Sequence, residues 1–116
     1  MPVSRTIFER FLVTVLFVTG FAMLFRRWLF TGFDGIFGDD ADGEIMLALV
    51  AHWDWVFAGA VGWADPSFFY PERGTLGYTD AVFLYGLAHA ALHAMGFDIF
   101  SAFMVVMAAL AGIGFF

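Results

Sequence analysis

The chain alternates between long apolar segments and one acidic stretch, and this alternation limits the folds open to it. Residues 34–80 carry nine of the eleven carboxylates, while the apolar segments lie on either side. Hydrophobic residues make up 62% of the chain, against roughly 45–50% in ordinary soluble domains. A water-soluble domain of 116 residues could not bury that much apolar surface. The sequence therefore predicts an all-α, polytopic membrane protein with a single membrane domain.

Three segments are predicted to cross the bilayer as helices: residues 11–30, 81–97 and 99–116. The apolar run of the first is short, but flanking arginine stems can reach the interface, and residues 28–30 extend it. A cleavable signal peptide is the alternative, although no small-residue cleavage site follows. A tight connection at residues 96–98 predicts that the second and third segments form a helical hairpin. Because the third segment runs to residue 116 without a flanking charge, we expect the chain to be the N-terminal part of a longer protein.

Residues 31–80 are predicted to form an extramembrane loop that carries an interfacial helix. Residues 44–57 have plausible helical spacing, and glycines at 59 and 62 end the pattern. Tryptophans at 53, 55 and 63 suit a helix lying at the level of the lipid headgroups. Positive charges on the two sides of the first span nearly balance. The free N-terminus then favours an N-terminus in the cytoplasm and an acidic loop outside it.

Three carboxylates, Asp39, Asp40 and Asp42, stand just before this predicted helix. Carboxylates favour the positive end of a helix dipole, so capping or plain solvation is the favoured interpretation. The alternative is a substrate or metal role, because Mg²⁺ and Mn²⁺ take oxygen ligands of this kind. Asp40 and Asp42 form a D-x-D pair, which many sugar transferases use around a metal. Asp80 either caps the next helix or points its carboxylate into a site at the bilayer surface.

The three histidines allow functional and structural interpretations. His52 lies on the predicted interfacial helix, where it can be a ligand, a proton shuttle or a hydrogen-bonding group. His89 and His93 share one helical face at a spacing of four residues, which can hold a metal. No third ligand is evident near them in the sequence. Polar packing is therefore the favoured interpretation of this pair.

Several of these segments together resemble bacterial polytopic glycosyltransferases of the GT-C type. The matching pieces are Gly-Asp-Asp-Ala-Asp at 38–42, the helix with His52, Phe-Phe-Tyr-Pro at 68–71 and Leu-Gly-Tyr-Thr-Asp at 76–80. The resemblance covers roughly residues 10–116, which is the opening portion of such a protein. It implies a multi-pass protein of the bacterial inner (cell) membrane. It also implies transfer of a sugar from a polyprenyl-phosphate carrier to an extracytoplasmic acceptor.

The resemblance also implies roles for individual residues. The catalytic candidates are Asp39 and Asp42 as the base and Asp80 as a second acid that orients the substrate. The substrate-binding candidates are Asp40, His52, Tyr70, Arg73 and Tyr78, and a divalent cation, Mg²⁺ or Mn²⁺, would lie on Asp40 and Asp42. Relatives often carry a glutamate directly before the histidine of the interfacial helix, and Ala51 stands there in this chain.

The expected partners are the lipid bilayer and a lipid-linked sugar. No nucleic acid is expected, because the net charge is −6 and lysine is absent. The alternative to an enzyme is a non-catalytic membrane module, a transporter or assembly subunit, whose acidic loop is only solvated.

Overall fold

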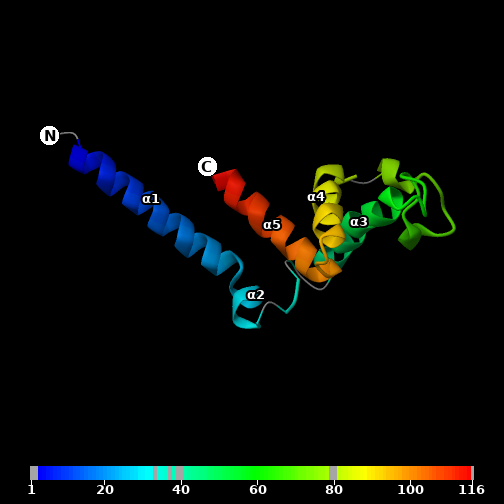
Figure 1. Cartoon of the computed structure of the whole chain (residues 1–116), viewed down its shortest axis with the longest axis horizontal. Coiled ribbons are helices and arrows are strands. Elements are labelled where there is room, and N and C mark those ends of the chain that lie inside the picture. The colour runs from blue at the N-terminus through cyan, green and yellow to red at the C-terminus, as the bar shows by residue number, and fades with distance from the viewer. Residues whose placement is uncertain (1–2, 33, 37, 39–40, 79–80, 116) are drawn as a thin grey trace. The chain divides into compact units, whose positions relative to one another are not determined.

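A computed structural model describes residues 3–32, 34–36, 38, 41–78 and 81–115, with side chains except at 3–5 and 78 (Figure 1). The predicted all-α fold is confirmed, and no strand occurs among these residues. The chain divides into two compact units. Unit 1 comprises Met1–Gly35 with Ala108–Phe116, and unit 2 comprises Ile36–Met107.

Unit 1 contains a long apolar helix, α1 (Val3–Leu24), and a short helix, α2 (Arg26–Phe30). Phenylalanines four residues apart form an aromatic row along α1 and just past its end, with ring centroids 5.7 Å apart for Phe17 and Phe21 and 4.7 Å apart for Phe21 and Phe25. Phe25 separates the two helices. The Thr31 hydroxyl ends α2 by donating a 2.7 Å hydrogen bond to the Arg27 carbonyl.

One helix in the described part of the chain is long and apolar enough to cross a membrane. It is the Thr6–Leu24 portion of α1, 19 residues whose side chains are not buried by the protein. At about 1.5 Å per residue it rises roughly 28 Å, close to the ~30 Å of a bilayer core. The predicted bounds of this segment, 11–30, were wrong, because the α-helix is interrupted at Phe25 and residues 26–30 belong to α2.

The structure does not support three membrane-spanning helices. The second predicted span is α4 (Phe83–Ala94), which has 12 residues and rises only about 18 Å. The helix cannot begin before Phe83, because the φ of Val82 is +41° and lies outside the right-handed helical region. Gly96, with a φ of +101°, follows the end of the helix. The third is α5 (Ile99–Phe115), with 17 residues. The predicted tight connection between these helices is present.

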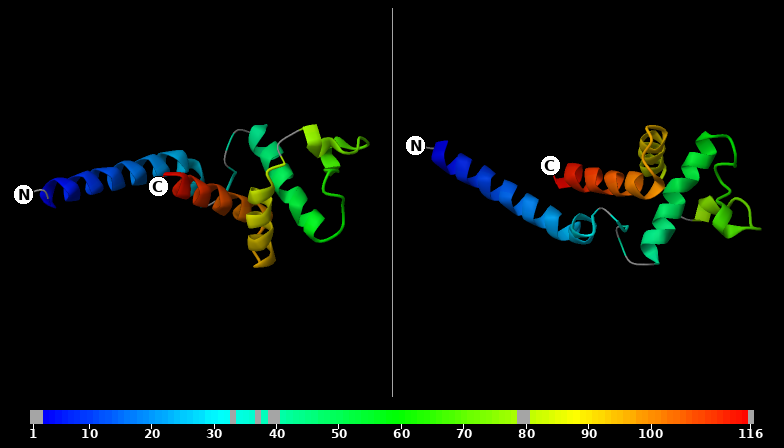
Figure 2. Two further views of the ribbon diagram at one scale, coloured as in Figure 1. Left: turned by 90° about the horizontal axis from the view of Figure 1, so that it is seen from above. Right: turned by 60° about the horizontal axis from the view of Figure 1, so that its bottom comes forward.

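The core of unit 2 is the contact between α3 (Asp42–Phe57) and α4, which lie side by side (Figure 2). The helix predicted at 44–57 is therefore confirmed, with two additional residues at its start. Leu49 and Trp53 of α3 are buried with Leu76 from the following loop. The Trp53 indole N–H donates a 2.7 Å hydrogen bond to the carbonyl of Ala81. Gly86 of α4 faces this indole, so the absence of a side chain there allows the close approach.

The loop between α3 and α4 contains two short 3₁₀ helices, η1 (Ser67–Phe69) and η2 (Thr75–Tyr78). Two hydrogen bonds join its ends. The Leu76 N–H donates to the Ala64 carbonyl at 3.2 Å, and the Gly74 N–H donates to Asp65 Oδ1 at 2.7 Å. The segment 64–76 is therefore a closed ring of chain, which we call the 64–76 ring.

Candidate functional site

The predicted acids are only partly within the described residues. Asp39, Asp40 and Asp80 lie outside them, whereas Asp42 is the first residue of α3 and is exposed. Asp42 and Glu44 both occupy the first turn of α3, where the helix dipole favours negative charge. Asp42 and His52 are ten residues apart on one helix, or roughly 15 Å along its axis. The structure therefore does not bring this acid to the histidine.

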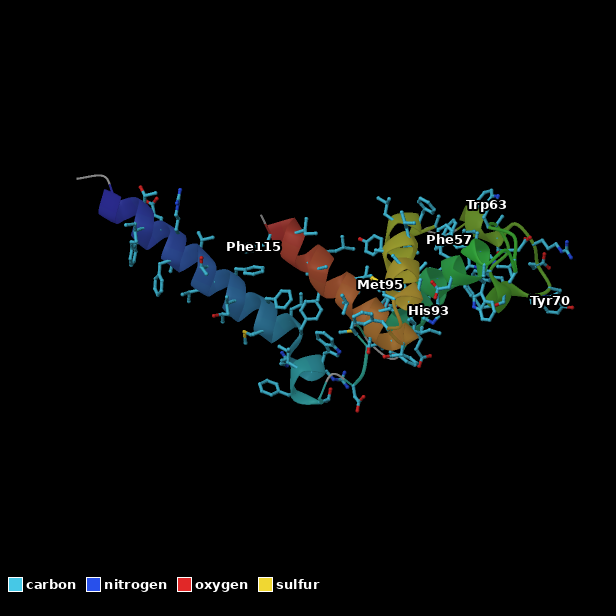
Figure 3. The ribbon with its side chains drawn as sticks, viewed as in Figure 1. Phe57, Trp63, Tyr70, His93, Met95 and Phe115 are labelled. Atoms are coloured by element: carbon cyan, nitrogen blue, oxygen red, sulfur yellow. The ribbon has the colours of Figure 1, made fainter. Side chains whose placement is uncertain are left out.

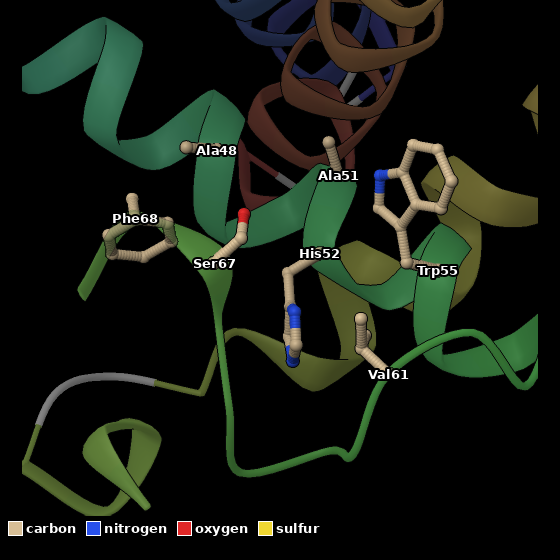
Figure 4. A pocket seen from close by; sticks show the side chains of 7 residues that line it. All are labelled: Ala48, Ala51, His52, Trp55, Val61, Ser67 and Phe68. Atoms are coloured by element: carbon tan, nitrogen blue, oxygen red, sulfur yellow. The ribbon is translucent and has the colours of Figure 1, made fainter. Parts of the chain in front are cut away.

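His52 is buried and lines a pocket of about 440 Å³ between α3 and the following loop (Figure 4). Its Nε2 lies 2.9 Å from the carbonyl oxygen of Trp63. A carbonyl only accepts hydrogen bonds, so Nε2 is the donor in this contact, and a neutral ring would then keep Nδ1 as an acceptor. The pocket is lined by Ala48, Ala51, His52, Trp55, Val61, Ser67 and Phe68.

A second pocket, of about 420 Å³, adjoins the first and shares Val61 and Ser67 with it. Its walls come from the 64–76 ring and the residues just before it. They include two of the predicted substrate-binding residues, Tyr70 and Arg73. Tyr70 projects from the ring and is 87% exposed (Figure 3). The structure thus brings Tyr70 and Arg73 into one pocket and His52 into its neighbour.

The charge in the second pocket is mixed. Asp65 and Glu72 line it together with the guanidinium of Arg73. Asp65 has a structural role, because its Oδ1 holds the Gly74 N–H and so closes the 64–76 ring. The phenol of Tyr70 adds a neutral donor and acceptor. This set of groups can bind a polar molecule that carries both hydroxyls and negative charge. The side chain of the remaining candidate, Tyr78, lies outside the described part.

A third group of polar side chains, the Asp54 cluster, links α3 to α4. It consists of Asp54, His89 and His93. Asp54 Oδ1 lies 3.1 Å from His89 Nδ1, and Asp54 Oδ2 lies 2.9 Å from His93 Nδ1. His89 is fully buried, whereas the His93 side chain is 43% exposed. One carboxylate therefore bonds both histidines, each through a separate oxygen.

The contacts of His89 limit where the protons of the Asp54–His89 pair can lie. Its Nε2 lies 3.0 Å from the carbonyl oxygen of Ile99, so both ring nitrogens face oxygens. A neutral imidazole donates through one nitrogen only. Either His89 is an imidazolium beside an ionised Asp54, or Asp54 is protonated and donates to a neutral His89. Both arrangements hold the same number of protons and leave the pair without net charge, which suits its burial.

The histidine pair therefore has the neighbouring acid that the sequence did not reveal. Asp54 is 35 and 39 residues away from the two histidines along the chain, and only the pairing of α3 with α4 brings them together. Two sequence features could have pointed to this cluster: an aspartate inside an apolar helix, and two histidines on one helical face. The contacts agree with polar packing. Among the residues that the structure describes, no group of three such side chains is arranged to hold a metal ion.

The geometry thus gives two adjoining pockets around three predicted substrate-binding residues, and a separate Asp54 cluster. The cation predicted on Asp40 and Asp42 stays a prediction, because Asp40 lies outside the described residues. No protein-family model, curated protein or solved structure matches the chain.

Proposed function

We propose that the chain forms part of a membrane glycosyltransferase that moves a sugar from a polyprenyl-phosphate donor to an acceptor outside the cytoplasm. The observation that carries the proposal is that His52, Tyr70 and Arg73, which the family resemblance implies as substrate-binding residues, line two adjoining pockets. Each pocket has a volume within the range of about 300–1,000 Å³ that is typical of small-molecule sites.

The groups in these pockets suit a sugar phosphate. The Arg73 guanidinium can bind two phosphate oxygens at once, which offsets the repulsion from nearby carboxylates. Nδ1 of His52 accepts a hydrogen bond, and the Ser67 and Tyr70 hydroxyls both donate and accept. Trp55 and Phe68 supply an apolar wall for the less polar face of a sugar ring.

The membrane location is part of the proposal. In it, α1 crosses a bacterial inner membrane, which places the protein where a lipid-linked donor diffuses. The 17 residues of α5 fall at the lower limit of the roughly 17–25 that span a bilayer. If α5 also crosses the membrane, the protein is multi-pass and loop 31–80 lies outside the cytoplasm.

The acids supply the chemistry in this proposal. Asp42 or Asp39 removes the proton of the acceptor hydroxyl, and Asp80 orients the reacting groups. The acceptor oxygen then bonds to the sugar carbon, and the polyprenyl phosphate leaves with the electron pair of the broken bond. A Mg²⁺ or Mn²⁺ ion on Asp40 and Asp42 would neutralise charge on the phosphate.

The test is sugar transfer by the whole gene product, with every segment that its reading frame encodes, in membranes supplied with labelled lipid-linked sugars. Asp42→Asn and Arg73→Gln are each expected to lower the rate by about 10²-fold or more, a typical effect for acid–base and charge-stabilising groups. Asp34→Asn is the matched control, because Asp34 is an exposed acid of the same loop to which the proposal gives no role. Unchanged transfer in both test variants would refute the assignment.

A non-catalytic membrane module is the second candidate, and the position of two acids favours it. Asp42 and Glu44 lie in the first turn of α3, where carboxylates stabilise a helix whether or not they bind a substrate. On this alternative, Asp42→Asn slightly lowers the thermal stability of the chain, and no lipid-linked sugar is consumed by the whole gene product or by any variant.

A further inference from the structure

A third pocket in unit 2 adjoins the Asp54 cluster and differs from the proposed sugar site in all but one of its lining residues. Its volume is about 410 Å³, and it shares only Trp55 with the pocket of His52. Most of its wall is apolar. It is lined by Asp54, Trp55, Phe57, Ala58, Ala90, His93, Ala94 and Ile99. The pocket thus combines an apolar interior with one carboxylate–histidine pair.

The carboxylate determines which nitrogen of His93 is available to a ligand. Asp54 Oδ2 lies 2.9 Å from Nδ1 of His93 and accepts a hydrogen bond from the N–H of this nitrogen. The Asp54–His89 pair already has no net charge, so no unpaired charge in the cluster holds a second proton on His93, and we take its ring as neutral. Its Nε2 is then a bare acceptor. Within the described part of the chain, no group donates a hydrogen bond to this Nε2, and the His93 side chain, which lines the pocket, is 43% exposed.

These features select one class of ligand. A bare imidazole nitrogen needs a donor, so a hydroxyl fits it and an ether or carbonyl does not. No arginine or lysine is among the described residues that line the pocket, which disfavours an anion. Both oxygens of Asp54 already contact histidines, which disfavours an ammonium group. A metal ion would find one free ring nitrogen, whereas protein metal sites use three or four ligands.

We propose that this pocket binds a small apolar alcohol or phenol whose hydroxyl donates to Nε2 of His93. The apolar body of the ligand replaces water against Trp55, Phe57 and Ile99, which supplies most of the affinity. Asp54 acts as a positioning residue, because it orients the imidazole and fixes its tautomer. This proposal does not rest on the proposed sugar transfer, although Trp55 lines both pockets.

The test uses the full chain, labelled with ¹⁵N-histidine in lipid nanodiscs, and two probes, 4-propylphenol and its methyl ether. Ring ¹⁵N chemical shifts separate bare from protonated nitrogens, and the bare Nε2 signal of His93 is expected to shift saturably with the phenol. The phenol is expected to bind about fivefold more tightly than the ether, as one net hydrogen bond implies. His93→Leu should abolish this preference, whereas His52→Gln, in the neighbouring pocket, should retain it.

Each other outcome overturns the proposal. A protonated Nε2 on His93 at neutral pH would contradict the tautomer. Equal affinity for phenol and ether, or an equal preference in His93→Leu and the unaltered chain, would show that the hydroxyl is not bound there. Failure of both probes to bind would show that the pocket takes no ligand of this class. None of these results depends on sugar transfer, so they leave the proposed function unaffected.

Discussion

Replacing Gly86 by alanine should separate α3 from α4. A Cβ at this position would lie 2.7 Å from the Cβ of Trp53 and closer still to the first carbons of its indole ring. Overpacking of this kind costs about 1–3 kcal/mol. Displacing the indole also breaks its hydrogen bond to the Ala81 carbonyl, at about 1 kcal/mol. The higher helix propensity of alanine offsets about 1 kcal/mol of this loss in the free energy of unfolding. The net expectation is a free energy of unfolding lower by about 1–3 kcal/mol.

The matched control is Gly112→Ala in α5, where a Cβ would meet nothing within 4 Å. This variant gains the helix propensity without a clash, so its stability should be unchanged or higher by up to about 1 kcal/mol. Thermal unfolding of both variants in the same detergent, followed by near-ultraviolet circular dichroism and tryptophan fluorescence, makes the comparison. If Gly86→Ala unfolds at the same temperature as Gly112→Ala, the close contact of α4 with Trp53 is refuted.

Three further substitutions test other contacts of unit 2. Asp54→Ala leaves the buried ring of His89 without its acid and should lower the free energy of unfolding by about 3 kcal/mol; a loss below about 1 kcal/mol in chemical denaturation would argue against the cluster. Leu76→Ala removes a side chain that is 2% exposed and should cost about 2–5 kcal/mol, and no change in the unfolding midpoint would place Leu76 outside the core. Hydrogen bonds from the Ser101 hydroxyl and N–H hold the pKa of Asp98 below its ordinary value of 3.8. The ionised carboxylate therefore stabilises α5 fully when the pH is above the ordinary pKa, and this stabilisation is lost as the pH falls through the lowered pKa. Far-ultraviolet circular dichroism should show this loss in the unaltered chain but not in Asp98→Ala, and identical acid titrations would contradict it.

Much of the helical framework could be predicted from the sequence. The helix that ends at Phe57 and the helix that begins at Ile99 follow from local patterns. Asp98 caps the latter helix, because its Oδ1 accepts 3.0 Å hydrogen bonds from the N–H groups of Phe100 and Ser101. Apolar composition alone could not set helix length. The break at Phe25 and the left-handed backbone at Val82 are local conformations without a distinctive residue pattern.

The arrangement of the polar side chains depended on contacts between distant parts of the chain. Tyr70 and Arg73 lie on the 64–76 ring, and the hydrogen bonds that close this ring join a carbonyl and a carboxylate to backbone N–H groups further along the chain. The pairing of Asp54 with two histidines requires α4 to lie on α3. The types of these residues indicate which hydrogen bonds they can form, but only tertiary packing determines which groups become their partners.

The exposed position of Tyr70 on the 64–76 ring gives a direct means of finding which side of a membrane this loop faces. The sequence contains no cysteine, so Tyr70→Cys would create the single thiol of the chain at a side chain that contributes to no core. A maleimide that cannot cross lipid would then label intact cells if the loop faces outward, and only broken cells if it faces the cytoplasm. Because the ring is closed by hydrogen bonds that do not involve the Tyr70 side chain, the label can be carried there without opening the loop.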